Sequence, residues 1–311
     1  CFYFVEIVEM NDYNNTNDKN FDIPLNPSVE QAWHAWLQVT RARCHLHYEL
    51  EGNSLRSHVG TCLRSATAQM QRISSGVARS PRKILEIGCS TGFNCIALSQ
   101  LFPAAEIHGI EPDGEAVLVA NRMARAASIG NVHFHEGVGE DLPFENSEFD
   151  LIICLTVIEH VENVEAVISE ICRVLNAGGI VRLEAPNYVW PYEPHLGIWC
   201  VPLLGKKFAK LMALLQGKGS LLRYLDHLKF VTPGKLEAAF KKCNLDWHNE
   251  VETKLRKTLD GNAQQVMAYK RAAALLSALA RLGTADLLVK VVMWSKLYPS
   301  VLYTIRKPKK H

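Results

Sequence analysis

The sequence predicts an α/β fold built on a mostly parallel β-sheet. After residue 81, short apolar runs alternate with amphipathic helical segments, a pattern typical of parallel strands joined by crossover helices. Most of these runs are apolar throughout rather than at every second position, as in strands that helices cover on both faces. The expected strands are residues 83–87, 106–110, 132–135, 149–155 and 180–184, and the expected helices are residues 93–102, 114–128 and 164–175.

A helical cap is expected ahead of the sheet. Apolar residues recur at helical spacing over residues 27–73, which indicates helices with one buried face. Residues 11–20 are mostly Asn and Asp, and this composition predicts a disordered lead-in. We therefore divide the chain into residues 1–80, a lead-in with a helical cap, and residues 81–311, the main domain.

The regular alternation stops over residues 186–232. Prolines and aromatic residues follow one another there, including Trp190, Tyr192 and Trp199, and this composition favours a stiff lid beside the sheet. The last part of the chain is expected to hold a helix at residues 233–243, two strands at residues 246–253 and 300–307, and a helical insertion at residues 263–297.

Composition excludes several classes of protein. The 34 Lys and Arg residues nearly balance the 32 Asp and Glu residues, whereas a nucleic-acid-binding domain usually has a strong basic excess. The nine cysteines include no Cys-x-x-Cys pair, so we expect reduced thiols in a cytoplasmic protein and neither a zinc site nor a disulfide framework. The first ten residues hold two glutamates and no basic residue, so we expect no signal peptide.

The strongest functional signal is Lys-Ile-Leu-Glu-Ile-Gly-Cys-Ser-Thr-Gly at residues 83–92. An apolar strand runs directly into a turn at Gly88 and Gly92, where the backbone can approach a ligand closely. The segment lacks the G-x-G-x-x-G spacing of a dinucleotide site, and Glu86 places a carboxylate where a pyrophosphate would be repelled. A ligand that carries positive charge and no phosphate fits this loop better.

Two acidic segments follow the next two strands. Glu111 ends the second strand about 20 residues beyond the glycine loop, where nucleoside-binding α/β folds use an acid to accept the ribose hydroxyls. After the third strand comes Gly-Glu-Asp-Leu-Pro-Phe, in which Asp141 can accept from an adenine amino group and Leu142 can pack on the ring. Together with the glycine loop, these acids indicate a nucleoside site at one edge of the sheet.

As a set, these three segments resemble the class I S-adenosylmethionine-dependent methyltransferases, in the broad group with the ubiquinone and menaquinone enzymes. The resemblance implies a Rossmann-like fold with a seven-stranded, mostly parallel sheet, in which the two late strands form an antiparallel edge. It implies S-adenosylmethionine as cofactor and a methyl transfer to O or N of a small molecule that is aromatic, glycosylated or lipid-linked. The implied cofactor residues are Glu86, Gly88, Ser90 and Gly92 at the methionine part, Glu111 at the ribose, Asp141 and Leu142 at the adenine, and Thr156 at the end of the fourth strand.

The run Glu159-His160-Val161 after the fourth strand also resembles this family. Quinone-precursor O-methyltransferases carry an additional acid three positions before that Glu, and Thr156 stands at the matching position here. Because the pair of carboxylates is broken, we expect no metal at this point, and Glu159 with His160 to cap and orient the next helix.

A methyl acceptor with a hydroxyl group would need a general base, whereas a phenol, carboxylate or amine would need little help. The candidate bases are His195, His227 and His160. His195 lies two residues after Glu193 and His227 lies directly after Asp226, both in the segment where this family builds its acceptor pocket. His195 ranks first because prolines and aromatics surround it.

Two further alternatives concern partners and function. Residues 263–297 are apolar with interspersed basic residues, which suits either peripheral membrane contact or, as we favour, a helical hairpin packed on the sheet or on a second copy in a homodimer.

We expect no nucleic-acid partner. A nicotinamide-dependent oxidoreductase is disfavoured by Glu86 and the missing glycine spacing, and a catalytically silent cofactor-binding protein is the main competitor.

Overall fold

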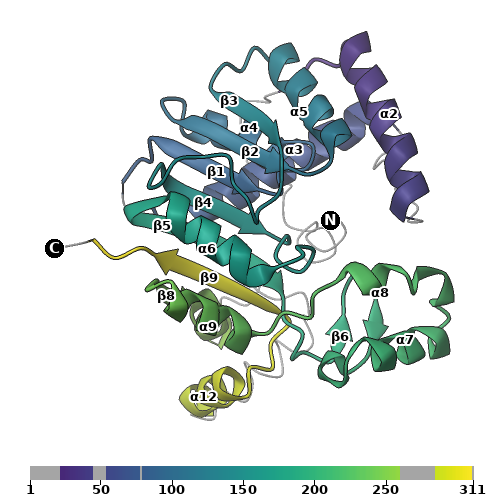
Figure 1. Ribbon diagram of the computed structural model, residues 1–311, viewed down its shortest axis with the longest axis vertical. Helices are drawn as coiled ribbons and strands as arrows, with labels where there is room; N and C mark the ends of the chain where they lie inside the picture. The colour runs from purple at the N-terminus through teal and green to yellow at the C-terminus, as the bar shows by residue number, and fades with distance from the viewer. Residues whose placement is uncertain (1–21, 45–53, 78, 260–283, 310–311) are drawn as a thin grey trace.

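A seven-stranded, mostly parallel sheet organises the structure, which confirms the predicted fold class. The computed structural model describes residues 22–44, 54–77, 79–259 and 284–309 (Figure 1). The strand order of the sheet is β3-β2-β1-β4-β5-β9-β8. The strands are β1 (Lys83–Ile87), β2 (Glu106–Glu111), β3 (Val132–Glu136), β4 (Phe149–Leu155), β5 (Leu175–Pro186), β8 (Asp246–Asn249) and β9 (Ser300–Arg306).

The direction of the strands agrees with the expected antiparallel edge. Strands β1 to β5 pair in parallel with their neighbours. Strand β9 runs antiparallel to β5 on one side and to β8 on the other. Strand β8 therefore points the same way as β1 to β5, and among the strands of this sheet β9 alone is reversed.

Helices cover both faces of the sheet (Figure 1). Successive residues of a strand point to opposite faces, so Leu151 and Ile153 of β4 join one core while Ile152 and Cys154 join the other. All four side chains are fully buried. The first core packs under α2 (Pro27–Cys44), α3 (Leu55–Ser74), α4 (Phe93–Leu101) and α5 (Gly114–Ala126), and the second under α6 (Val164–Val174) and α9 (Pro233–Lys242).

The expected N-terminal cap is present as α2 and α3. Trp33 of α2 is fully buried and lies edge-on to Trp36, with ring centroids 5.1 Å apart, and 6.1 Å from the ring of Phe93 on α4. The Trp36 indole N–H donates to a carboxylate oxygen of Asp113 over 3.2 Å, which ties α2 to the start of α5. The expected lead-in at residues 11–20 lies outside the described residues. The division of the chain at residue 80 stays a prediction.

Residues 186–232 are more regular than we expected. They form a lobe beside the sheet from a short hairpin, β6 (Tyr192–Glu193) and β7 (Ile198–Trp199), followed by α7 (Lys206–Leu215) and α8 (Tyr224–His227) (Figure 1). The lobe has its own small core, which includes Leu196, Ala209 and Leu225. The residues of this core come from separate short elements, so no single period in the sequence predicts their packing.

The strand expected at residues 246–253 is wrong in its second half. β8 stops at Asn249, whose side-chain oxygen accepts the N–H of Val251 over 3.1 Å and begins α10 (Glu250–Leu259). Leu255 and Leu259 are buried four residues apart on one face of this helix. The helical period of these side chains prevails over the strand-like character of the first residues.

The expected helical insertion at residues 263–297 is described only in its last part. Residues 260–283 lie outside the described residues, and α12 (Ala285–Ser295) follows them. Val289 of α12 is buried against Leu255 and Leu259 of α10. Among the described residues, no helix combines the length and the apolarity that crossing a bilayer requires.

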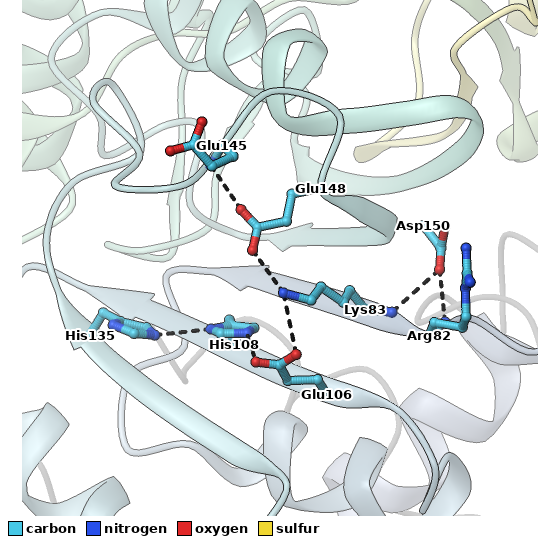
Figure 2. Close-up of polar contacts among 8 residues, drawn as sticks. All are labelled: Arg82, Lys83, Glu106, His108, His135, Glu145, Glu148 and Asp150. Carbon is cyan, nitrogen blue, oxygen red and sulfur yellow. Dashed lines mark hydrogen bonds and ion pairs between the residues drawn. The ribbon is translucent and has the colours of Figure 1, made fainter.

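A polar network fixes the starts of the central strands. Figure 2 shows Lys83, at the start of β1, with its ammonium group 2.9 Å from Glu148 and 3.3 Å from Glu106. Glu106 in turn lies 3.0 Å from a ring nitrogen of His108, whose other ring nitrogen lies 3.0 Å from His135. Apart from His135, which lies near the carboxyl end of β3, this network lies before or in the first half of the strands, away from the glycine loop.

We expect His108 to make the fold sensitive to acid. Burial lowers the pKa of His108, against the opposing effect of Glu106, and the neighbouring His135 and His133 lower it further. The folded state therefore takes up the proton at lower pH than the unfolded state, so stability falls as pH drops below about 6.5. The melting temperature of the wild-type protein should decline more steeply between pH 7 and pH 5 than that of His108→Gln. His34→Gln, a change at an exposed position of α2, should follow the wild type. Parallel wild-type and His108→Gln curves would contradict the assignment.

Candidate functional site

The loop between β1 and α4 is held in a conformation that needs glycine at two positions. Gly88 and Gly92 have φ angles of +74° and +87°. A Cβ atom on Gly88 would lie 2.3 Å from a methyl group of Val157, and one on Gly92 would lie 2.6 Å from the ring of Phe134. The loop is thus pressed against the residue after β4 on one side and against β3 on the other. The sharp turn agrees with the sequence motif, which did not predict these two contacts.

Glu111 links the glycine loop to the end of β2. One of its carboxylate oxygens accepts the backbone N–H of Ser90 over 2.9 Å, and the other accepts the N–H of Asp113 over 3.2 Å. The side chain is half-buried, and burial raises its pKa. Both oxygens keep a further lone pair, so the carboxylate can accept two hydroxyl groups of a ligand lying along the loop.

Glu86 lies beneath the loop rather than on its surface. Its carboxylate is 3% exposed, accepts from the side-chain amide of Asn94 over 2.7 Å, and lies 3.0 Å from the donor Sγ of Cys95. Burial raises the pKa of Glu86 to about 7. A polar group of a ligand would meet Glu86 together with Asn94, a residue that we did not single out although it stands in the first turn of the helix after the glycine loop.

We expect the raised pKa of Glu86 to make the stability of the protein depend on pH. Its folded-state pKa of about 7 exceeds the ordinary value of 4.5, so between these values the folded state holds a proton that the unfolded state has released. Folding is therefore disfavoured progressively as pH rises from about 4.5 to about 7, and the effect is constant above that. We expect the melting temperature of Glu86→Gln to rise relative to that of the wild type as pH increases over this interval. Above about pH 7 the difference between the two melting temperatures should stay constant. A difference that stays constant from pH 4.5 to pH 8 would refute the raised pKa.

The end of β3 offers an apolar contact that the sequence analysis missed. Val138 stands between Gly137 and Gly139, whose α-carbons approach the side chains of Ile110 and Ile87 at the tips of β2 and β1. Val138 is 44% exposed, and the N–H of the preceding Gly137 donates to the backbone carbonyl of Glu111 over 3.1 Å, so an exposed apolar side chain follows directly after the contact with the end of β2. The signal was a lone apolar residue between two glycines at a strand end.

The two residues that we expected at the adenine differ in their surroundings. Asp141 is exposed, as a carboxylate that accepts from a ligand requires. Leu142 is buried in the core under α6, and its N–H donates to Glu170 over 2.8 Å. The role of Asp141 at the adenine stays a prediction, whereas the burial of Leu142 leaves little of its side chain open to a ligand.

The end of β4 closes the same edge of the sheet. Thr156 has a φ angle of +53°, and its N–H donates to the carbonyl of Glu184 on β5 over 2.8 Å. This strained turn directs the next residue, Val157, against Gly88. The structure thus brings the glycine loop, Glu111 and Thr156 to one sheet edge, as expected from their places at the carboxyl ends of parallel strands.

A second group of polar side chains lies just beyond Thr156. Glu159 is fully buried, and one of its oxygens lies 3.8 Å from Nε2 of His160 and 3.9 Å from Nε2 of His195 in the turn of the β6–β7 hairpin. Nδ1 of His195 lies 2.6 Å from the buried carboxylate of Glu193. The rings of His160 and His195 stand edge to face with centroids 5.1 Å apart.

Burial sets the charge state of this group. It raises the pKa of Glu159 to about 7 and lowers that of His160 to about 3, so His160 is neutral near pH 7. His227, the third candidate base, is exposed on α8 and does not join the group. Of the three predicted histidines, the structure therefore brings two together.

Comparisons with known proteins agree with this geometry. Residues 79–229 match the family model of a methyltransferase domain. The uncharacterized methyltransferase YcgJ of Bacillus subtilis (strain 168) is 32% identical over 124 residues, which cover 40% of this chain and 47% of that protein. The ubiquinone biosynthesis O-methyltransferase of Bartonella quintana (strain Toulouse) is 24% identical over 174 residues, which cover 54% of this chain and 62% of that protein. The chain thus matches less than two thirds of the length of either relative.

A solved structure supports the same fold. The crystal structure of the [4+2]-cyclase SpnF superposes with a TM-score of 0.50 at 19% identity, over 93% of this chain and 100% of that one. A parallel sheet with a glycine loop and an acid at the next strand tip defines a nucleoside-binding α/β domain. The family match over residues 79–229 and the similarity to methyltransferases support a class I S-adenosylmethionine-dependent methyltransferase domain, with S-adenosylmethionine as the cofactor that fits this edge of the sheet.

Proposed function

We propose that this protein transfers a methyl group from S-adenosylmethionine to an oxygen or nitrogen atom of a small molecule. The observation that carries the proposal is the contact of Glu111 with the N–H of Ser90, because it sets a ribose-binding carboxylate against the glycine loop. Gly88, Gly92 and Thr156 line the same edge. In this proposal Glu86 acts with Asn94 at the methionine end of the cofactor, and Val138 and Asp141 lie at the adenine.

Methyl transfer requires little of the protein beyond positioning the acceptor and the cofactor. The sulfonium group of the cofactor already holds a good leaving group, so the protein has to align the acceptor with the methyl carbon and keep water out. A hydroxyl acceptor must also lose a proton. His195 is our first candidate for that step, because Glu193 accepts from its Nδ1 and leaves Nε2, which lies 3.9 Å from Glu159, as the unprotonated nitrogen.

We propose that the acceptor is apolar, and the lobe of residues 186–232 supports this. Its outer surface exposes several large apolar side chains beside the lysines of α7, an arrangement that suits a lipid-linked acceptor held near an anionic membrane surface. The exposed side chains are Trp199, Val201, Leu203, Leu204, Leu211, Leu214 and Leu215.

Vesicle co-sedimentation tests this part of the proposal. The wild type should bind vesicles that contain anionic phosphatidylserine at low salt, and Leu204→Ser/Leu215→Ser should bind less. Trp294→Ser provides the matched change on α12, where Trp294 is 85% exposed. Loss of binding in Trp294→Ser alone would assign membrane contact to the region of residues 263–297 instead. If the wild type binds no vesicles, membrane contact is refuted. The exposed face of α12 would then be tested as a contact with a second copy of the chain, by measuring the oligomeric state by sedimentation equilibrium.

The central test is an acceptor screen that follows release of S-adenosylhomocysteine. Turnover with at least one phenol, amine, sugar or lipid-linked compound is expected, and Glu111→Ala should abolish it. Cofactor binding without turnover across the whole panel would favour the catalytically silent alternative. Failure of the folded protein to bind S-adenosylmethionine or S-adenosylhomocysteine would overturn the proposal.

A further inference from the structure

Three side chains with metal-ligating atoms meet beyond the tip of β4. They are Glu159 and His160, from the segment after the strand, and His195, from the hairpin of the lobe. One ligand atom from each lies within 4.8 Å of the other two. The chain segments that supply them are far apart in the sequence, so the fold itself creates the cluster.

The carboxylate at the centre lacks the partners that a buried carboxylate needs. Glu159 is fully buried, and within the described part of the chain neither of its side-chain oxygens has a hydrogen-bond partner. Nε2 of His160 is also buried without one. Buried carboxylates are normally hydrogen-bonded, paired or bound to a metal ion, because leaving them alone costs several kcal/mol.

The distances suit an ion between the groups better than direct contact. The two imidazole nitrogens lie 3.8 Å and 3.9 Å from the same Glu159 oxygen, too far for hydrogen bonds. An ion bound at about 2.0–2.2 Å from each ligand holds its ligand atoms roughly 3.0–3.6 Å apart. The three ligand atoms lie within 4.8 Å of one another, so binding an ion would require side-chain movements of about 1 Å.

A second carboxylate orients one of the histidines as a ligand. Because a carboxylate only accepts, the 2.6 Å contact with Glu193 assigns the proton of His195 to Nδ1, so Nε2, which lies 3.9 Å from Glu159, is the unprotonated nitrogen. Glu193 is fully buried and also accepts the backbone N–H groups of His195 and Leu196. A metal-binding histidine is held in this way in many metalloproteins, by a carboxylate that accepts from its other nitrogen.

The sequence led us to expect no metal here, but on this geometry we propose that Glu159, His160 and His195 bind a divalent transition-metal ion, with zinc as the best match to two imidazoles and one carboxylate. Three protein ligands leave at least one coordination position open. Under the proposed methyl transfer, an acceptor hydroxyl bound there would lose its proton more easily, and His195 would act as a ligand rather than as the base. That use of the ion depends on the proposed function, whereas ion binding itself does not.

Metal binding to the purified chain tests the proposal without any methyl acceptor. After treatment with a chelator and dialysis, the wild type should bind one equivalent of Zn²⁺, and Co²⁺ should give visible absorption bands without the intense thiolate bands of cysteine ligation. Glu159→Gln and His195→Gln should each bind roughly 100-fold more weakly or not at all. Glu193→Gln should bind about 10–100-fold more weakly, because it only orients His195.

His227→Gln is the matched control, since it removes an exposed histidine of the same lobe and should bind Zn²⁺ like the wild type. Melting curves and S-adenosylhomocysteine binding establish that each variant is folded. If the wild type binds no stoichiometric Zn²⁺, Co²⁺ or Mn²⁺, or if Glu159→Gln and His195→Gln both bind as well as the wild type, the metal site is refuted. Either result leaves the acceptor screen and the proposed methyl transfer to be judged on their own.

Discussion

Glu111→Ala should weaken the binding of S-adenosylhomocysteine by about 100-fold or more. The carboxylate is proposed to accept both ribose hydroxyls, and a hydrogen bond to a charged group contributes about 1.5–3 kcal/mol, so losing two removes at least about two factors of ten. The same change frees the N–H groups of Ser90 and Asp113, which loosens the glycine loop. Titration calorimetry on the purified protein gives the dissociation constant directly.

Glu136 supplies a matched control for this change. It is the last residue of β3, it pairs in register with Glu111, and it is exposed. Glu136→Gln should bind S-adenosylhomocysteine like the wild type. The affinity of Glu111→Gln should lie between that of the wild type and that of Glu111→Ala. If Glu111→Ala binds normally while its melting curve shows a folded protein, the ribose assignment fails, and with it the main support for the cofactor site.

The cofactor edge could be predicted from the sequence because its signals are local. The strand, the glycine turn and the following helix stand within residues 83–101, and Glu111 falls at the end of the next apolar run. In a parallel sheet, the carboxyl ends of neighbouring strands meet at one edge, so consecutive strand ends predict a shared site. Val138 escaped this reasoning because its only signal, one apolar residue between two glycines at a strand end, does not by itself indicate a ligand contact.

The acceptor side could be predicted only in part. His160 and His195 were both candidates, yet nothing in the spacing of these residues indicates that they share the carboxylate of Glu159. Their meeting depends on how the lobe of residues 186–232 lies against the segment after β4, where the carbonyl of Glu159 accepts the N–H of Lys229 over 2.6 Å. A contact between two irregular segments has no period that a sequence pattern can show.

The second half of the strand expected at residues 246–253 illustrates a different limit. Val251 and Thr253 favour a strand, whereas the burial of Leu255 and Leu259 against α12 favours a helix. Local propensity is a weak preference, and packing against a neighbouring element overrides it. That neighbour lies more than 25 residues further along the chain, so the local pattern could not include it.

Gly88→Ala should destabilise the fold and remove cofactor binding together. A non-glycine residue at a φ of +74° costs about 1–2 kcal/mol, and forcing a methyl group against Val157 costs about 1–3 kcal/mol more. For a chain of this size, each kcal/mol lowers the melting temperature by about 2–4 °C, so we expect a fall of roughly 5–15 °C. The loop must shift to relieve the contact, and this shift separates the N–H of Ser90 from Glu111.

Two further variants separate the backbone effect from the steric one. Gly217 has a φ of +73°, close to that of Gly88, and a Cβ atom there would meet nothing within 4 Å, so Gly217→Ala should show only the backbone cost and keep cofactor binding. In Gly88→Ala/Val157→Ala, the two Val157 methyl groups are gone and the nearest remaining atom of that residue is its Cβ, at 3.3 Å. The double variant should therefore recover part of the stability and part of the cofactor affinity relative to the sum of the single changes. Strict additivity of the two changes would mean that Val157 does not hold the loop, and the contact between the tips of β1 and β4 would lose its role in shaping the cofactor site.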